Sequence, residues 1–112
     1  MAFLPDKTFL EETICNNYDL SNGVSAFTSS DVSKYITVSI QVCYTNIQGN
    51  NEFVLEQSND STNWADLSQN YTLPVGSGNF IIDKGTFSGK HIRLNLKVAN
   101  SGLITIKLLA KR

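Results

Sequence analysis

The chain has 112 residues, of which 41% are hydrophobic and 17% charged, and its formal net charge is −1. This length suits one compact domain and is too short for two. A near-neutral chain without a block of like charges lacks the basic surface that nucleic-acid binding requires, and no apolar run is long enough to span a membrane. We therefore expect a single domain over residues 1–112, with neither nucleic acid nor membrane as a partner.

The first ten residues, "MAFLPDKTFL", carry four large apolar side chains around a proline: Phe3, Leu4, Phe9 and Leu10. One interpretation is a terminal strand that covers the domain. The other is an N-terminal arm, residues 1–10, that inserts these side chains into a neighbouring subunit. Ordering a tail costs about 1–2 kcal/mol per residue, and burying one large apolar side chain returns about 1.5–3 kcal/mol. An arm therefore needs a partner surface.

Period-two alternation of apolar and polar side chains is the clearest structural signal along the rest of the chain. Each alternating segment offers one face to a core and one to solvent. No segment has the pattern of a helix, because β-branched residues and asparagines fill the periodic stretches. The predicted strands are residues 11–16, 23–28, 35–45, 52–58, 71–73, 79–83, 91–98 and 103–110.

Seven or eight such strands must form two sheets to cover their apolar faces. The predicted fold class is all-β, an antiparallel β-sandwich, with immunoglobulin-like and jelly-roll topologies both left open. The turns at 46–51 and 99–102 are predicted to close β-hairpins between their flanking strands. The last strand, 103–110, has Leu103 and Leu109 on its polar face, which predicts an edge strand able to pair with another copy.

The polar octet "QSNDSTNW" at residues 57–64 ends in the single tryptophan of the chain. Asn59 and Asp60 are typical turn residues, so the structural interpretation is a turn that folds Trp64 back over the end of the sandwich as a plug. In the main alternative, Trp64 stacks on a sugar ring while Asn59 and Asp60 bond its hydroxyls. Calcium is disfavoured, because it requires several carboxylates and few acidic residues lie nearby.

Few other residues are candidates for chemistry. The single histidine, His91, lies on the polar face of a strand, and no CxxC or HxxxH spacing supports a metal site. Cys15 and Cys43 are expected to be reduced thiols, because no export signal indicates an oxidising compartment. No nucleophile motif, paired carboxylates or phosphate loop is visible. We therefore predict no catalytic residue, no cofactor and no metal.

Phe87 is expected to fold inward from its loop.

Residues 53–110 resemble small β-sandwich structural proteins of tailed bacteriophages. In that family a strand leads into Ser-Asn-Asp-x-x-x-Trp, a Tyr/His-Ile-Arg strand follows later, and a terminal hairpin closes the pattern. Discoidin-like and other carbohydrate-binding sandwiches share the loop-and-tryptophan arrangement. The matching residues are Ser58, Asn59, Asp60 and Trp64, then His91, Ile92 and Arg93, and last Gly102, Ile104 and Ile106.

Among phage proteins, the size and the lack of an enzymatic motif resemble head decoration or auxiliary capsid proteins, with the crAss-like phages as one candidate source. The resemblance implies a non-enzymatic virion protein, assembled in the host cytoplasm. It would decorate or reinforce the capsid by binding major capsid subunits or other virion proteins, through its loops or the N-terminal arm. The alternative is a carbohydrate-binding module, or a tail or fibre component, that contacts host glycans through the octet. Head or tail location and oligomeric state stay open.

Overall fold

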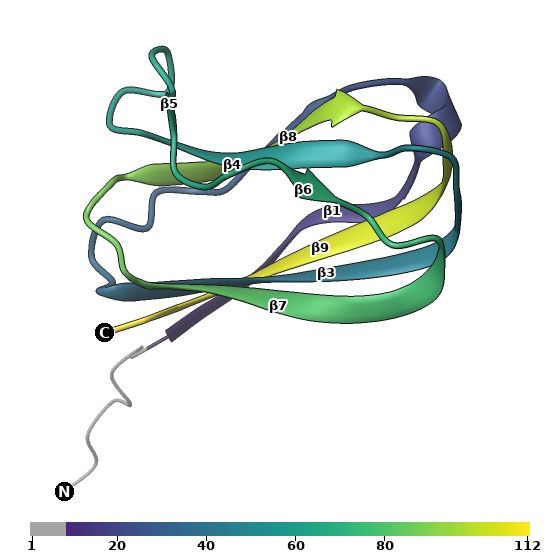
Figure 1. The fold of residues 1–112 in the computed structure, drawn as a ribbon. Helices are drawn as coiled ribbons and strands as arrows, with labels where there is room; N and C mark the ends of the chain where they lie inside the picture. Colours follow the sequence, from purple (N-terminus) through teal and green to yellow (C-terminus); the bar gives the residue numbers. More distant parts are fainter. Residues whose placement is uncertain (1–8) are drawn as a thin grey trace, which may run out of the picture.

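Two antiparallel sheets packed face to face make up the computed structural model, which describes residues 9–112 (Figure 1). Sheet A has four strands and sheet B has five. One turn of 3-10 helix, η1 at Leu20–Asn22, follows the first strand. The strands are β1 (Phe9–Asp19), β2 (Ala26–Thr28), β3 (Thr37–Gln48), β4 (Glu52–Ser58), β5 (Ala65–Asp66), β6 (Tyr71–Thr72), β7 (Gly76–Thr86), β8 (His91–Val98) and β9 (Ser101–Lys111).

The strand order is that of a jelly roll. Sheet A has the order β1-β9-β3-β7, and sheet B has the order β2-β8-β4-β5, with β6 also paired to β4. β5 and β6 pair with opposite ends of β4, so together they form one interrupted strand. Apart from that pair, consecutive strands alternate between the sheets, as in the two Greek keys of a jelly roll. The predicted antiparallel sandwich is confirmed, and the topology that the sequence left open is decided.

Both predicted hairpins are wrong, and so is the predicted edge strand. Residues 46–51 carry the chain from β3 in sheet A to β4 in sheet B, and residues 99–102 carry it from β8 in sheet B to β9 in sheet A. The same turn-forming residues serve a hairpin and a crossover equally well. The strand at 103–110 lies inside sheet A, because β9 pairs with β1 on one side and β3 on the other.

The core lies between the sheets, and it is built from the predicted inward faces of β3, β8 and β9. Ile36 is predicted on the same inward face as Val38 within the strand 35–45, but it precedes β3 and is 55% exposed. Phe87 folds inward as predicted and is buried. The inward residues of the three strands that are buried as predicted are Val38, Ile40, Val42, Ile92, Leu94, Leu96, Ile104, Ile106, Leu108 and Ala110.

Asn51 joins the two crossover turns at one end of the sandwich. Its side chain is completely buried. Nδ2 donates to the carbonyls of Gln48 (3.0 Å) and Gly49 (3.3 Å), and Oδ1 accepts from the N–H of Asn100 (2.6 Å). A buried amide with satisfied donors and acceptor is tolerated in a core. Nothing in the sequence distinguishes Asn51 from the asparagines beside it, because its partner lies 49 positions away.

Cys15 and Cys43 are free thiols on opposite faces of sheet A. Cys15 belongs to the core cluster, and its Sγ donates to the carbonyl of Ile104 at 3.6 Å. Burial raises the pKa of the Cys15 thiol, which keeps it protonated. Cys43 alternates along β3 with the buried Val42, so it points to the outer side. The sheet between them separates the two sulfur atoms.

Candidate functional site

The octet at residues 57–64 forms a turn that is closed by its own hydrogen bonds. Asp60 Oδ1 accepts from the backbone N–H groups of Thr62 (2.9 Å) and Asn63 (2.8 Å), and Asp60 Oδ2 accepts from Asn63 Nδ2 (2.9 Å). Ser58 Oγ donates to Asp60 Oδ1 and accepts from the backbone N–H of Ser61 (2.9 Å). The predicted turn is therefore present, and Asp60 is its organiser.

These hydrogen bonds change the acidity of Asp60. They hold the pKa of Asp60 well below its usual range. The largest contribution comes from the backbone N–H of Asn63, followed by the Asn63 side chain. The backbone N–H of Thr62 and the hydroxyl of Ser58 contribute less. A carboxylate that accepts several N–H bonds prefers its ionised form. Oδ1 is occupied by three of these hydrogen bonds, whereas Oδ2 accepts only one and keeps an acceptor site on the exposed side of the turn.

Asp60→Asn is expected to remove part of the pH dependence of stability. Because the folded-state pKa lies below the unfolded value of about 3.9, the ionised carboxylate contributes stability above about pH 4 that is lost as the pH falls through the acid range. Urea unfolding of both proteins between neutral and acidic pH measures this. The stability difference should shrink as the pH falls. The control is Asp66→Asn, which lies outside the turn. If the stability difference between wild type and Asp60→Asn does not change with pH, or changes as it does for Asp66→Asn, then Asp60 does not stabilise the turn through its ionised carboxylate.

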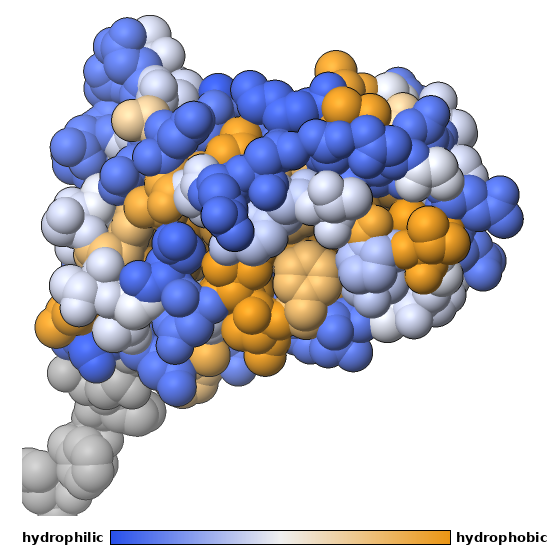
Figure 2. Space-filling view, in the orientation of Figure 1, coloured by the Kyte–Doolittle hydropathy of each residue, from blue (hydrophilic) through white to orange (hydrophobic). Residues whose placement is uncertain are grey.

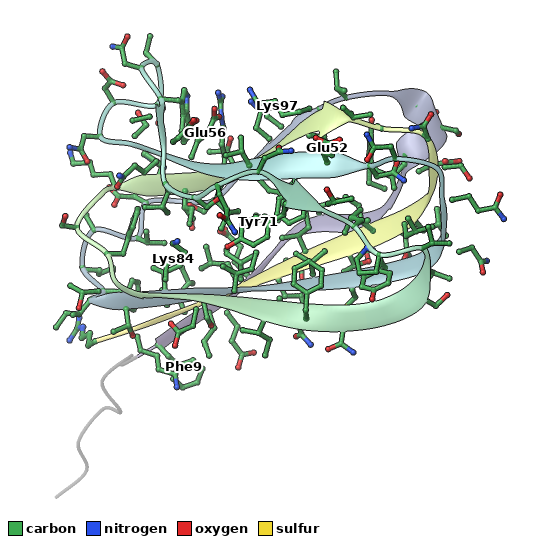
Figure 3. All side chains as sticks on the ribbon, viewed as in Figure 1. Phe9, Glu52, Glu56, Tyr71, Lys84 and Lys97 are labelled. Carbon is green, nitrogen blue, oxygen red and sulfur yellow. The ribbon has the colours of Figure 1, made fainter. Side chains whose placement is uncertain are left out.

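Trp64 folds back as predicted, but onto the outer face of sheet B and not over the end of the core. The side chain is half-buried, and the guanidinium of Arg93 lies 4.2 Å from the centre of its ring. Arg93 Nε donates to Glu56 Oε1 at 2.6 Å, and Asn95 Nδ2 donates to the same oxygen at 3.2 Å. Glu56 and Arg93 are opposite each other on β4 and β8, and Glu56 appears on this outer side in Figure 3. One ring face of Trp64 is thus occupied by the protein itself.

Arg93→Met is expected to destabilise the fold by about 2 kcal/mol. Removing one partner of a buried ion pair costs about 3–5 kcal/mol because the other charge stays buried, and we reduce this because the Arg93 side chain is 23% exposed, against 8% for Glu56. The double variant Arg93→Met/Glu56→Met should lose less than the sum of the two single variants, since no unpaired charge remains. Chemical denaturation measures all four proteins. Strict additivity would show that the pair is not coupled.

The other predicted contact residues lie partly at this turn and partly in sheet A. Asn59 remains at the turn, where its Oδ1 accepts from the backbone N–H of Lys90 (3.2 Å). Phe9 and Leu10 are the first residues of β1: Phe9 is 50% exposed on the outer side of sheet A (Figure 3), and Leu10 packs against the core. Phe3 and Leu4 lie outside the described residues. Phe9 and Leu10 therefore belong to sheet A, whereas the octet turn follows β4 of sheet B.

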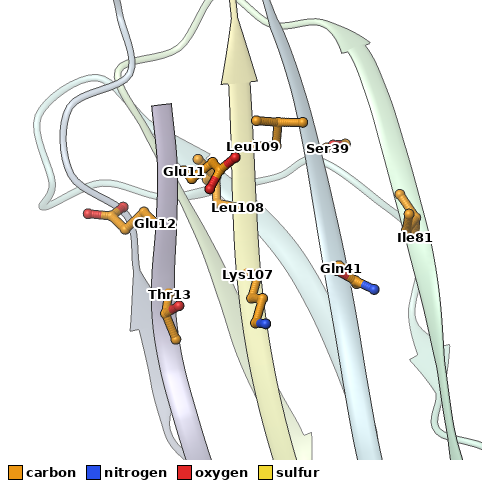
Figure 4. A pocket seen from close by; sticks show the side chains of 9 residues that line it. All are labelled: Glu11, Glu12, Thr13, Ser39, Gln41, Ile81, Lys107, Leu108 and Leu109. Atoms are coloured by element: carbon orange, nitrogen blue, oxygen red, sulfur yellow. The ribbon is translucent and has the colours of Figure 1, made fainter. Parts of the chain in front are cut away.

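Two of the surface depressions bear on the candidate site. The larger, of about 480 Å³, lies on the outer face of sheet A, where Glu11, Lys107 and Ile81 come from three different strands (Figure 4). The smaller, of about 410 Å³, lies between the octet turn and residues 88–89, and its walls include Asn59 and other polar groups. Sequence reasoning missed the larger one, because its residues come together only when β1, β9, β3 and β7 are placed side by side.

Within residues 9–112 no three His, Cys, Asp or Glu side chains gather in a group that could hold a metal ion. In the same part of the chain, no helix has the length and apolar content needed to cross a membrane. His91 is half-buried, and its Nδ1 lies 3.3 Å from the carbonyl oxygen of Ser29. Its role here is to join the start of β8 to the segment after β2.

Neither a family model nor a curated protein matches this chain. Several solved structures, however, have a similar fold. The SPBc2 prophage-derived protein YomS has a TM-score of 0.63 at 13% identity, over 100% of this chain and 98% of YomS. The K3 cleaved adhesin domain of Lys-gingipain from Porphyromonas gingivalis W83 has a TM-score of 0.58 at 11% identity, over 92% of this chain and 72% of that one.

A third similar structure is that of infectious bursal disease virus Gx strain, with a TM-score of 0.52 at 10% identity, over 91% of this chain and 32% of the viral chain. At such identities the likeness establishes the fold alone. The resemblance to phage β-sandwich proteins is therefore supported in its architecture: a prophage-derived protein has the same fold over nearly its whole length.

Proposed function

We propose that this chain is a non-enzymatic structural protein of a phage virion, which attaches to the capsid and reinforces contacts between major capsid subunits. The observation that carries the proposal is the likeness to a prophage-derived protein over 100% of this chain and 98% of the other. The viral structure that shares the jelly roll over 91% of this chain adds support.

The geometry is consistent with a static binding role. The crossover turns are tied together through Asn51, and the octet turn is tied through Asp60, so the loops present a surface that needs little ordering on binding. Many copies on one particle would make individually weak contacts add up. The proposed contact region is the N-terminal segment with Phe3 and Leu4, continued by the exposed ring of Phe9.

Mass spectrometry of purified particles, made from the genome that encodes this chain, tests the proposal. We expect the chain at a constant ratio to the major capsid protein, and in the head fraction after heads and tails are separated. Presence in infected cells together with absence from particles would refute the virion role. Recovery in the tail fraction would refute the capsid assignment while keeping the virion role.

A binding assay tests the contact region. Heads that lack this chain are mixed with the purified protein and sedimented, and the bound fraction is compared with that of Phe3→Ser/Leu4→Ser. We expect reduced binding with an unchanged circular dichroism spectrum. The control is Val24→Ser, which changes a 62% exposed side chain elsewhere on the surface. Equal binding of all three proteins would remove the N-terminal segment from the interface.

Glycan binding by a tail or fibre component is the second candidate. One observation favours it: the half-buried Trp64 adjoins an open polar depression that includes Asn59 and Asn63. Against it, the guanidinium of Arg93 already covers one face of the Trp64 ring, which leaves only the other face for a sugar. Fluorescence of Trp64 during titration with host surface glycans tests this candidate. A saturable spectral change together with protection from a quencher would support glycan binding. An unchanged spectrum would exclude Trp64 as the platform for a sugar ring.

A further inference from the structure

Sheet edges expose backbone N–H and C=O groups that can pair with another chain, and proteins usually block them. Sheet B has short edges, because β2 spans three residues and β5 and β6 span two each. The edges of sheet A are β1 and β7, each eleven residues long. Among the described residues, only these two edges are long enough for extended pairing.

β1 carries the features that block edge pairing. Its register with β9 shifts twice, between Thr13 and Cys15 and between Cys15 and Tyr18, and Asn17 has a left-handed backbone with φ of 50°. Such irregularities twist an edge and interrupt its row of hydrogen-bonding groups. Glu11 adds a charge on the outer side of the same strand. A second chain would meet a bent and charged edge here.

β7 lacks these features over its central part. Its pairing with β3 is regular from Gly78 to Asp83, and the register shifts fall outside that stretch. The stretch "GNFIID" contains no proline and carries one charge, at its end. Ile81 at its centre is 63% exposed, and Val75 just before β7 is 74% exposed. Figure 2 shows apolar side chains gathered along this side of the molecule, between β6 and β7.

We propose that β7 of one copy pairs antiparallel with β7 of a second copy, so that the two A sheets become one continuous sheet. A two-fold axis makes such a contact self-complementary. With Ile81 opposite Ile81 of the second copy, Asp83 lies opposite Asn79 and Lys84 opposite Gly78, so that no like charges face each other. The pairing also covers the most exposed apolar side chain of the strand.

This contact is small, because it joins two edges and not two broad faces. It falls in the size class of weak, transient interfaces, so we expect association that depends on protein concentration and becomes effective where copies are held close together. The inference rests on the edge geometry and not on the virion proposal. It also moves the predicted self-association from residues 103–110 to β7.

Sedimentation velocity over a concentration series tests the pairing, with Ile81→Lys as the disrupting variant. Wild type should show a monomer–dimer equilibrium. Ile81→Lys places two like charges opposite each other, which should weaken the dimer at least about tenfold. Val24→Lys is the matched control, since Val24 is 62% exposed and lies away from β7. It should associate like wild type.

Charge complementation separates a specific contact from a general loss of folding. Ile81→Lys and Ile81→Glu should each be monomeric with native circular dichroism, and their equimolar mixture should dimerise. Amide exchange of those residues within 78–83 whose N–H groups point away from β3 should slow as the wild-type concentration rises. The proposal is overturned if wild type stays monomeric with exchange independent of concentration, if Val24→Lys disrupts as strongly as Ile81→Lys, or if the mixture fails to associate.

Discussion

Gly102→Ala is expected to destabilise the fold by about 3–5 kcal/mol, because it combines backbone strain with overpacking. Gly102 has φ of +123°, a region that L side chains rarely adopt. A Cβ atom there would lie 2.5 Å from Ile47 Cδ1 and 2.9 Å from Ile47 Cα. Ile47 is completely buried, so its backbone has no free space to move into.

Gly76→Ala is the control that separates strain from collision. Gly76 has φ of +102°, but an added Cβ would meet no atom within 4 Å. We expect a loss of about 1–2 kcal/mol from backbone strain alone. Urea denaturation of both variants gives the difference. If Gly102→Ala loses no more unfolding free energy than Gly76→Ala, then Gly102 of β9 does not lie as close to Ile47 of β3 as the structure shows.

Phe53→Ala is expected to cost about 3–5 kcal/mol, the range for removing a buried aromatic side chain. Phe53 in β4 is 1% exposed. Its ring stacks with Tyr71 of β6 at 5.2 Å between centroids and with Phe80 of β7 at 6.4 Å, and Tyr71 lies between the sheets in Figure 3. Its removal therefore weakens the contact between sheet B and the β7 side of sheet A.

Phe9→Ala serves as the matched control for this variant. The same atoms are removed, but Phe9 is 50% exposed on the outer side of β1, and surface changes usually stay within about 0.5 kcal/mol. Denaturant midpoints of the two variants measure the contrast. Similar losses for both would mean that Phe53 is not at the centre of the core.

The two proposals can fail separately. Absence of the chain from particles refutes the virion role and leaves β7 pairing untouched. A strictly monomeric chain refutes β7 pairing and leaves attachment to capsid subunits open. Ile81→Lys and Phe3→Ser/Leu4→Ser change different segments of the chain, and we expect each to affect one assay only.

The octet shows how far local sequence reasoning reaches. Asn59, Asp60 and their neighbours predict a turn, because short polar side chains bond nearby amides, and the structure confirms it. The stacking of Trp64 on Arg93 depends on β8 lying beside β4. That neighbourhood is set by long-range pairing, and the residues of the octet contain no information about it.

The amino-acid sequence by itself determined the strongly alternating strands and most of their inward faces, because side-chain alternation is a local property of an extended backbone. Residues 92, 94 and 96 share one face of their strand for that reason, and that face is buried against the other sheet. The sequence did not predict the two-residue strand β5, which is too short to show a period. Only the tertiary structure decided which strands are neighbours. Whether residues 99–102 close a hairpin or cross between sheets depends on contacts such as that of Asn51 with Asn100. The same long-range pairing places β9 in the interior of sheet A and β7 at its edge.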